Sequence, residues 1–60
     1  MNLAKYQNKN IIVHTKDGND YEGRCVIARD SNGGKEYIPA YVKIGRTEFL
    51  ENSISRIEEI

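Results

Sequence analysis

The side chains that could carry out catalysis are few in this sequence. His14 is the only histidine and Cys25 the only cysteine, so one Cys–His pair is the only such nucleophile and base that can be drawn. The alternating pattern around them places Cys25 inward, as a small core residue, and His14 on the outer face of its strand. Asp17 and Asp20 are paired carboxylates in an expected turn, where aspartate bonds to the backbone. We therefore expect no catalytic residues and no enzyme.

Metal and cofactor chemistry are not expected either. One histidine and one cysteine are too few side chains for a zinc cluster. Gly33-Gly34 does not predict a phosphate-binding loop, because no helix is expected to follow it. The sequence therefore predicts neither a metal nor a cofactor.

A row of tyrosine and lysine side chains is the main candidate for a binding surface. Tyr37, Tyr41 and Lys43 alternate on one face of the strand expected at 36–44, and Lys35 lies just before that strand. Exposed tyrosines beside lysines offer anchors for a protein partner and stacking surfaces for nucleic-acid bases. The alternative is that the tyrosines cover the open end of the domain or pack under the N-terminal segment. We predict that these four residues bind a partner.

The elements that must position these residues are strands. Period-two alternation, interrupted by turn residues about every 8–12 positions, is typical of a small all-β domain. A short N-terminal segment, 1–9, with one weak helical turn, precedes a single domain over 10–60. Strands are expected at 10–16, 21–30, 36–44, 47–51 and 56–60, with one 3₁₀ turn at 52–54. We expect a five-stranded, strongly bent antiparallel barrel.

Two residues interrupt the expected strands. A glycine inside a strand weakens it unless the backbone bends sharply or another chain approaches closely. We interpret Gly23 as the corner at which a long strand bends to serve both halves of the sheet. Pro39 cannot donate a hydrogen bond to a ladder, so its part of the strand is an edge or a bulge. The segment 31–35 is the expected flexible loop.

The expected core consists of inward-facing apolar residues of all five strands. Its predicted members are Ile11, Val13, Tyr21, Cys25, Ile27, Ile38, Val42, Phe49, Ile54 and Ile57.

The stretch 11–25 resembles the first signature of the Sm and Sm-like proteins. A β-branched strand is followed by Asp17-Gly18 at the hairpin turn and by Gly23 in the next strand. The ending, 49–57, is similar to the short strand, 3₁₀ turn and closing strand shared by Sm-like and Src-homology-type barrels. The segment 43–46 is only loosely similar to the second Sm motif, in which an arginine directly precedes the glycine. The resemblance implies a small β-barrel over residues 10–60.

The resemblance also implies an RNA site. Sm-like proteins bind RNA bases with an aspartate, an aromatic residue and an asparagine in the loop after the second strand. The matching positions here are Asp30 and Asn32, and the second motif adds Lys43 and Arg46. The pattern departs from the family, because Asn32 follows Asp30 closely, no aromatic residue stands between them, and Arg46 follows its glycine. An RNA-binding Sm-like subunit is therefore the alternative function.

Charge and cysteine content favour a neutral protein of a reducing compartment. Nine basic side chains balance nine acidic ones, which gives no general attraction to nucleic acid or anionic lipid. Residues 1–46 hold eight basic and five acidic side chains, whereas residues 47–60 hold one and four. No apolar stretch approaches the length of a signal peptide or a membrane span. A single unpaired cysteine fits the cytoplasm, so we expect a cytoplasmic protein without membrane contact.

The combined prediction is a small binding or regulatory module that acts through protein–protein interaction. The richness in Asn, Lys, Ile and Tyr fits an AT-rich bacterial, phage or plasmid source, where small proteins regulate host factors. Sm-like subunits join through the strands expected here at 47–51 and 56–60. Both segments carry acidic side chains, which disfavours a ring, so we predict a monomer or homodimer.

Overall fold

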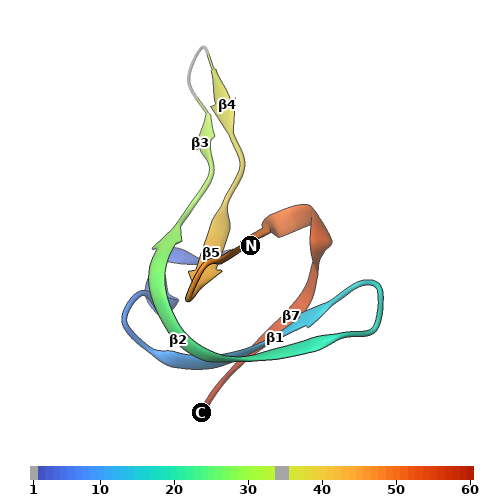
Figure 1. Cartoon of the computed structure of the whole chain (residues 1–60). Coiled ribbons are helices and arrows are strands. Elements are labelled where there is room, and N and C mark those ends of the chain that lie inside the picture. Colours follow the sequence, from blue (N-terminus) through green and yellow to red (C-terminus); the bar gives the residue numbers. More distant parts are fainter. Residues whose placement is uncertain (1, 34–35) are drawn as a thin grey trace.

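The computed structural model of the chain describes residues 2–33 and 36–60 (Figure 1). Five strands form one antiparallel sheet in the order β6-β5-β2-β1-β7, and two short strands, β3 and β4, form a separate hairpin. The elements are η1 (Ala4–Tyr6), β1 (Asn10–Thr15), β2 (Asp20–Arg29), β3 (Asn32–Gly33), β4 (Tyr37–Ile38), β5 (Tyr41–Ile44), β6 (Thr47–Leu50), η2 (Glu51–Ser53) and β7 (Ile54–Glu59). The prediction of an all-β chain with a five-stranded antiparallel sheet is confirmed. Within these residues, no helix is long and apolar enough to cross a membrane.

The long strand β2 serves both halves of the sheet. It pairs with β1 up to Arg24 and with β5 from Cys25 onward, and it curves strongly between the two (Figure 1). Gly23 lies just before this change of partner. A Cβ added there would come within 2.6 Å of Cγ2 of Ile44, and Gly23 is not among the positive-φ glycines. The expected corner is where the sequence placed it, but close packing against Ile44, rather than a glycine-only backbone angle, requires the glycine.

The sheet is open at β6 and β7. These are its edge strands, and no ladder joins them within the described residues, so no closed barrel is found there. The two halves nevertheless meet through side chains. The rings of Tyr21 and Phe49, from β2 and β6, lie 4.9 Å apart between centroids at an interplanar angle of 47°. Aromatic packing at this distance stabilises the curvature of the sheet.

Most of the expected core is confirmed. Among the predicted members, those buried are Ile11, Val13, Cys25, Val42, Phe49 and Ile54, and Ile57 packs against them while partly buried. The prediction was wrong for Tyr21 and Ile38, which are 39% and 50% exposed. Three buried residues were not predicted, namely Leu3, Ala28 and Ala40.

Two irregularities account for the differences at Ala28 and in the segment 38–40. The register of β2 against β5 shifts between Cys25 and Ile27, so the alternation reverses and Ala28, rather than Ile27, turns fully inward. The expected strand 36–44 is divided by two non-strand residues, Pro39 and the buried Ala40. Ile38 therefore belongs to β4 of the separate hairpin and not to the five-stranded sheet.

The N-terminal segment packs onto the sheet. Leu3 is fully buried, and its amide donates to Oδ1 of Asp30 at 2.7 Å. The amide of Ala4 donates to the same oxygen at 3.1 Å. Asn8 adopts a left-handed φ of 67°, and its amide donates to the carbonyl of Cys25 at 2.8 Å. The predicted weak turn is a 3₁₀ turn held by these tertiary contacts, because three helical residues are not stable alone.

The β3–β4 hairpin projects from the sheet (Figure 1). We call its described residues, 32–33 and 36–38, the arm. All of them are exposed, and Tyr37 reaches 67%. The sequence predicted a loop at Asn32 and Gly33, where the structure has the short strand β3. Lys35, a predicted binding residue, lies outside the described residues.

Candidate binding surface

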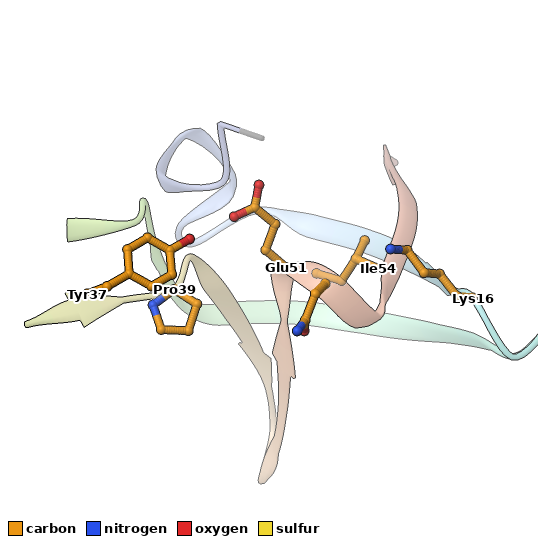
Figure 2. Close-up of a pocket in the computed structure, with 6 residues that line it drawn as sticks. Lys16, Tyr37, Pro39, Glu51 and Ile54 are labelled. Carbon is orange, nitrogen blue, oxygen red and sulfur yellow. The ribbon is translucent and has the colours of Figure 1, made fainter. Parts of the chain in front are cut away.

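Adjacent residues of the arm line two different hollows. Tyr37 lines the first, of about 460 Å³, which we call the Pro39 hollow (Figure 2). Ile38 lines the second, of about 430 Å³, which we call the Asp30 hollow. Successive side chains of a strand point to opposite faces, which explains how one short strand contributes to both.

The Pro39 hollow is held by backbone contacts from three parts of the chain. Its lining residues are Lys16, Tyr37, Pro39, Glu51, Asn52 and Ile54. The amide of Glu51 donates to the carbonyl of Ala40 at 2.8 Å, which ties η2 to the base of the arm. The amide of Lys16 donates to the carbonyl of Ser53 at 3.0 Å, which ties η2 to the end of β1. Two walls of the hollow are therefore fixed to the sheet.

The chemistry of the Pro39 hollow is amphipathic. The rings of Tyr37 and Pro39 lie together on the arm side, and the side chain of Lys16 reaches in from the opposite side (Figure 2). Ile54, which is 1% exposed, belongs to the core, and Glu51 lies between the two sides. The hollow thus combines an aromatic and apolar surface with one cationic and one anionic side chain. This balance suits a protein segment better than a phosphate group.

The Asp30 hollow brings together residues that the sequence assigned to different sites. It is lined by Ala4, Gln7, Ala28, Arg29, Asp30, Asn32, Ile38 and Tyr41. Asp30 and Asn32 come from the RNA prediction and Tyr41 from the predicted tyrosine row. Tyr41 of β5 pairs in register with Arg29 of β2, which places its ring beside the loop that follows β2. An aromatic side chain from another strand, Tyr41, thus lines the same hollow as Asp30 and Asn32.

Asp30 also has a structural task in this hollow. Its Oδ1 accepts hydrogen bonds from two consecutive backbone amides, those of Leu3 and Ala4. A carboxylate that accepts from the N–H groups at the start of a 3₁₀ turn acts as a cap, and this contact helps to fix the N-terminal segment. Any ligand that used Asp30 would share the carboxylate with this segment.

The predicted row of Tyr37, Tyr41 and Lys43 is not a single surface. The break at Pro39 and Ala40 sends Tyr37 and Tyr41 to different hollows. Lys43 is half-buried opposite Glu48 of β6, and Arg46 lies in the β5–β6 turn. Among the described residues that line the two hollows, neither of these cations is present. The sequence could have located the break from Pro39, but not the side to which each tyrosine turns.

The two residues considered for catalysis lie in separate environments. Cys25 is fully buried, and burial raises the pKa of its thiol above the usual range. His14 instead contacts two carboxylates, those of Asp20 and Glu58. Over residues 2–33 and 36–60, no group of three or more His, Cys, Asp or Glu side chains could hold a metal ion.

Comparison with known proteins adds no assignment. No family model, no curated protein and no solved structure matches the chain. The resemblance to Sm-like and Src-homology-type barrels therefore stays a prediction.

Proposed function

We propose that the protein is a non-enzymatic protein-binding module whose arm and Pro39 hollow form the binding surface. The observation that carries the proposal is the 67% exposure of Tyr37, a large aromatic side chain that lines the Pro39 hollow. An exposed aromatic and apolar surface with a polar rim is a common feature of interaction sites. Tyrosine is also among the residues that contribute most binding energy at protein interfaces.

The surroundings of Tyr37 support a protein partner. A typical interface has an apolar centre and a polar rim. Here Tyr37 and Pro39 supply the centre, while Lys16, Glu51 and Asn52 lie around it. A volume of about 460 Å³ falls within the range of ordinary ligand pockets, so the hollow accommodates one or two side chains of a partner.

The proposal includes the wider class of the protein. We infer a regulatory domain of a cytoplasmic protein of bacterial or phage type, which binds a host factor. The strong curvature of β2 and the return of β7 to the side of β1 support placing the sheet among the small barrels (Figure 1). The free, buried Cys25 agrees with a reducing compartment.

The experiment uses the two tyrosines as a matched pair. The immobilised protein is incubated with nuclease-treated bacterial lysate, and retained proteins are quantified by mass spectrometry. A specific partner is expected with the wild type and with Tyr41→Ser, and it is expected to be lost with Tyr37→Ser. The absence of any specific protein, or equal retention by wild type and Tyr37→Ser, contradicts the proposal.

A second candidate function is binding of single-stranded RNA at the Asp30 hollow. The observation in its favour is that this hollow joins a carboxylate, an amide and an aromatic ring, from Asp30, Asn32 and Tyr41, with Arg29 beside them. Bases stack on aromatic rings, and a cation contacts the phosphates. Titration with single-stranded oligonucleotides at several salt concentrations tests it. Binding that weakens with salt and with Tyr41→Ala, but not with Tyr37→Ala, would favour RNA over protein.

The proposed state of assembly is a monomer or homodimer. The edge strands β6 and β7 are the available pairing edges of the sheet, and they carry Glu48, Glu58 and Glu59. Carboxylates on two facing edges repel each other and disfavour a ring. Sedimentation at micromolar concentration decides the matter. A hexamer or heptamer would contradict this state and favour the RNA-binding function.

A further inference from the structure

His14 lies where three strands meet, away from both hollows. It belongs to β1, which is flanked by β2 and β7. The register places Asp20 of β2 opposite His14 on one side and Arg56 of β7 on the other. The ring is 19% exposed and contacts the carboxylates of Asp20 and Glu58. A register shift in the β1–β7 ladder falls directly after His14.

The two ring nitrogens of His14 face different carboxylates. Nδ1 lies 2.6 Å from Oδ1 of Asp20, and an ionised carboxylate only accepts hydrogen bonds, so Nδ1 carries a hydrogen in either charge state. Nε2 lies 3.2 Å from Oε1 of Glu58. This nitrogen is buried and has no hydrogen-bond partner in the described part of the chain. A neutral ring therefore carries no charge opposite the Glu58 carboxylate, whereas a charged ring forms an ion pair with it across 3.2 Å.

We propose that the charge of His14 sets how firmly the edge strand β7 is held to the sheet. The link to Asp20 persists in both charge states, because it uses the hydrogen on Nδ1. The link to Glu58 is an ion pair, which exists only when the ring is charged. His14 thus joins β2, β1 and β7 when its ring is charged and only β2 and β1 when its ring is neutral.

The other charged group at this junction limits the effect. Nη1 of Arg56 donates to the same Oε1 of Glu58, so Glu58 keeps a cationic partner on its own strand in either case. Asp20, Arg56 and Glu58 are 66%, 63% and 45% exposed, and water screens their interactions. We therefore expect a local change in β7 rather than unfolding. This inference does not depend on the proposed function.

Amide hydrogen exchange measured by NMR tests the inference. The readout is the protection of β7 amides divided by that of β5 amides in the same sample, corrected for intrinsic exchange rates. Between about pH 5.5 and pH 8 this ratio is expected to fall about threefold in the wild type, which is the size expected of an exposed ion pair. In His14→Gln the ratio is expected to be constant.

Two glutamate variants give a sharper comparison. Glu58→Gln removes the carboxylate that the charged ring attracts, so the change of the ratio with pH is expected to disappear. Glu59→Gln removes the same charge from the next residue of β7 and is expected to respond as the wild type does. A wild-type ratio that stays constant between about pH 5.5 and pH 8 would overturn the inference. A fall that persists in His14→Gln would overturn it as well.

Discussion

The curved sheet and the arm differ in where their apolar side chains lie. The buried core, from Ile11 to Ile54 along the strands, belongs to the sheet and the segments packed on it. The two large side chains of β4 instead remain exposed, Tyr37 at 67% and Ile38 at 50%. The same types of residue thus stabilise the fold in one region and remain available for contact in the other. Substitutions in the sheet should therefore lower stability, and substitutions in the arm should lower binding.

The largest difference in stability is expected between Leu3→Ala in the core and Ile38→Ala on the arm. Leu3 is fully buried, whereas Ile38 is half exposed on the arm. Leu3→Ala is expected to lower the free energy of unfolding by about 3 kcal/mol, because it leaves a cavity in the core. Ile38→Ala is expected to change it by less than about 0.5 kcal/mol. Urea denaturation of both variants measures this, and equal losses would remove the distinction between sheet and arm.

Gly23 of the sheet and Gly33 of the arm allow the same comparison, because only the first is closely packed. A Cβ at Gly23 would lie 2.6 Å from Ile44, whereas a Cβ at Gly33 of the arm meets no atom within 4 Å among the described residues. Gly23→Val is expected to cost about 2 kcal/mol through overpacking, and Gly33→Val close to nothing. Glu22→Val, one residue away, serves as a control for the valine itself. If Gly23→Val and Glu22→Val unfold at the same urea concentration, Ile44 does not pack as described.

A smaller effect is expected where the N-terminal segment meets the start of the arm. Asp30→Ala removes the acceptor for the amides of Leu3 and Ala4 and is expected to cost about 1 kcal/mol, as for a lost helix cap. Asn32→Ala, an exposed position on β3, is the matched control and should leave the urea midpoint unchanged. Similar midpoints for both variants would indicate that Asp30 does not hold the segment.

The smallest effect concerns the β1–β2 turn in acid. The hydroxyl of Thr15 donates to the carboxylate of Asp17, which lowers the pKa of Asp17 below its usual 3.8. Folding therefore favours the ionised form, and this contribution is present above the usual value and lost as the pH falls through the lowered pKa.

Asp17→Asn tests this contribution. The fall in melting temperature between about pH 5 and pH 2 should be smaller in Asp17→Asn than in the wild type. Glu36→Gln removes an exposed carboxylate of the arm and should retain the full fall. An unchanged fall in Asp17→Asn contradicts the stabilising role of the Thr15 contact.

Strand positions followed from the sequence because alternation and turn residues act locally. The hairpin at Asp17-Gly18 and the 3₁₀ turn before β7 are examples, with shifts of one or two residues at their ends. What the sequence did not reveal depends on contacts between distant residues. Leu3 is buried because its segment packs onto the sheet, where Asp30 and the backbone of Cys25 hold it. Ala28 replaces Ile27 in the core only because β2 shifts its register against β5.

The candidate site was predictable only in part, because local patterns identify single residues but not their neighbours from distant segments. Tyr37 was selected from the sequence because tyrosine beside charged residues marks interaction surfaces. Its separation from Tyr41 depends on the break at Pro39, and its neighbours Lys16 and Asn52 come from a distant hairpin and from η2. The meeting of Asp30, Asn32 and Tyr41 likewise requires the pairing of β2 with β5. No pattern within a single strand contains this information.

NMR mapping of the captured partner on the isotope-labelled protein tests the central claim most directly. If the arm and the Pro39 hollow bind the partner, the largest changes in amide chemical shift will fall on residues 32–33, 36–38 and 51–54 and on Lys16. The amides of β1 and of the first half of β2 will change little, because these strands provide stability rather than contact. Changes centred on the edges of β6 and β7, or confined to the Asp30 hollow, would contradict the account.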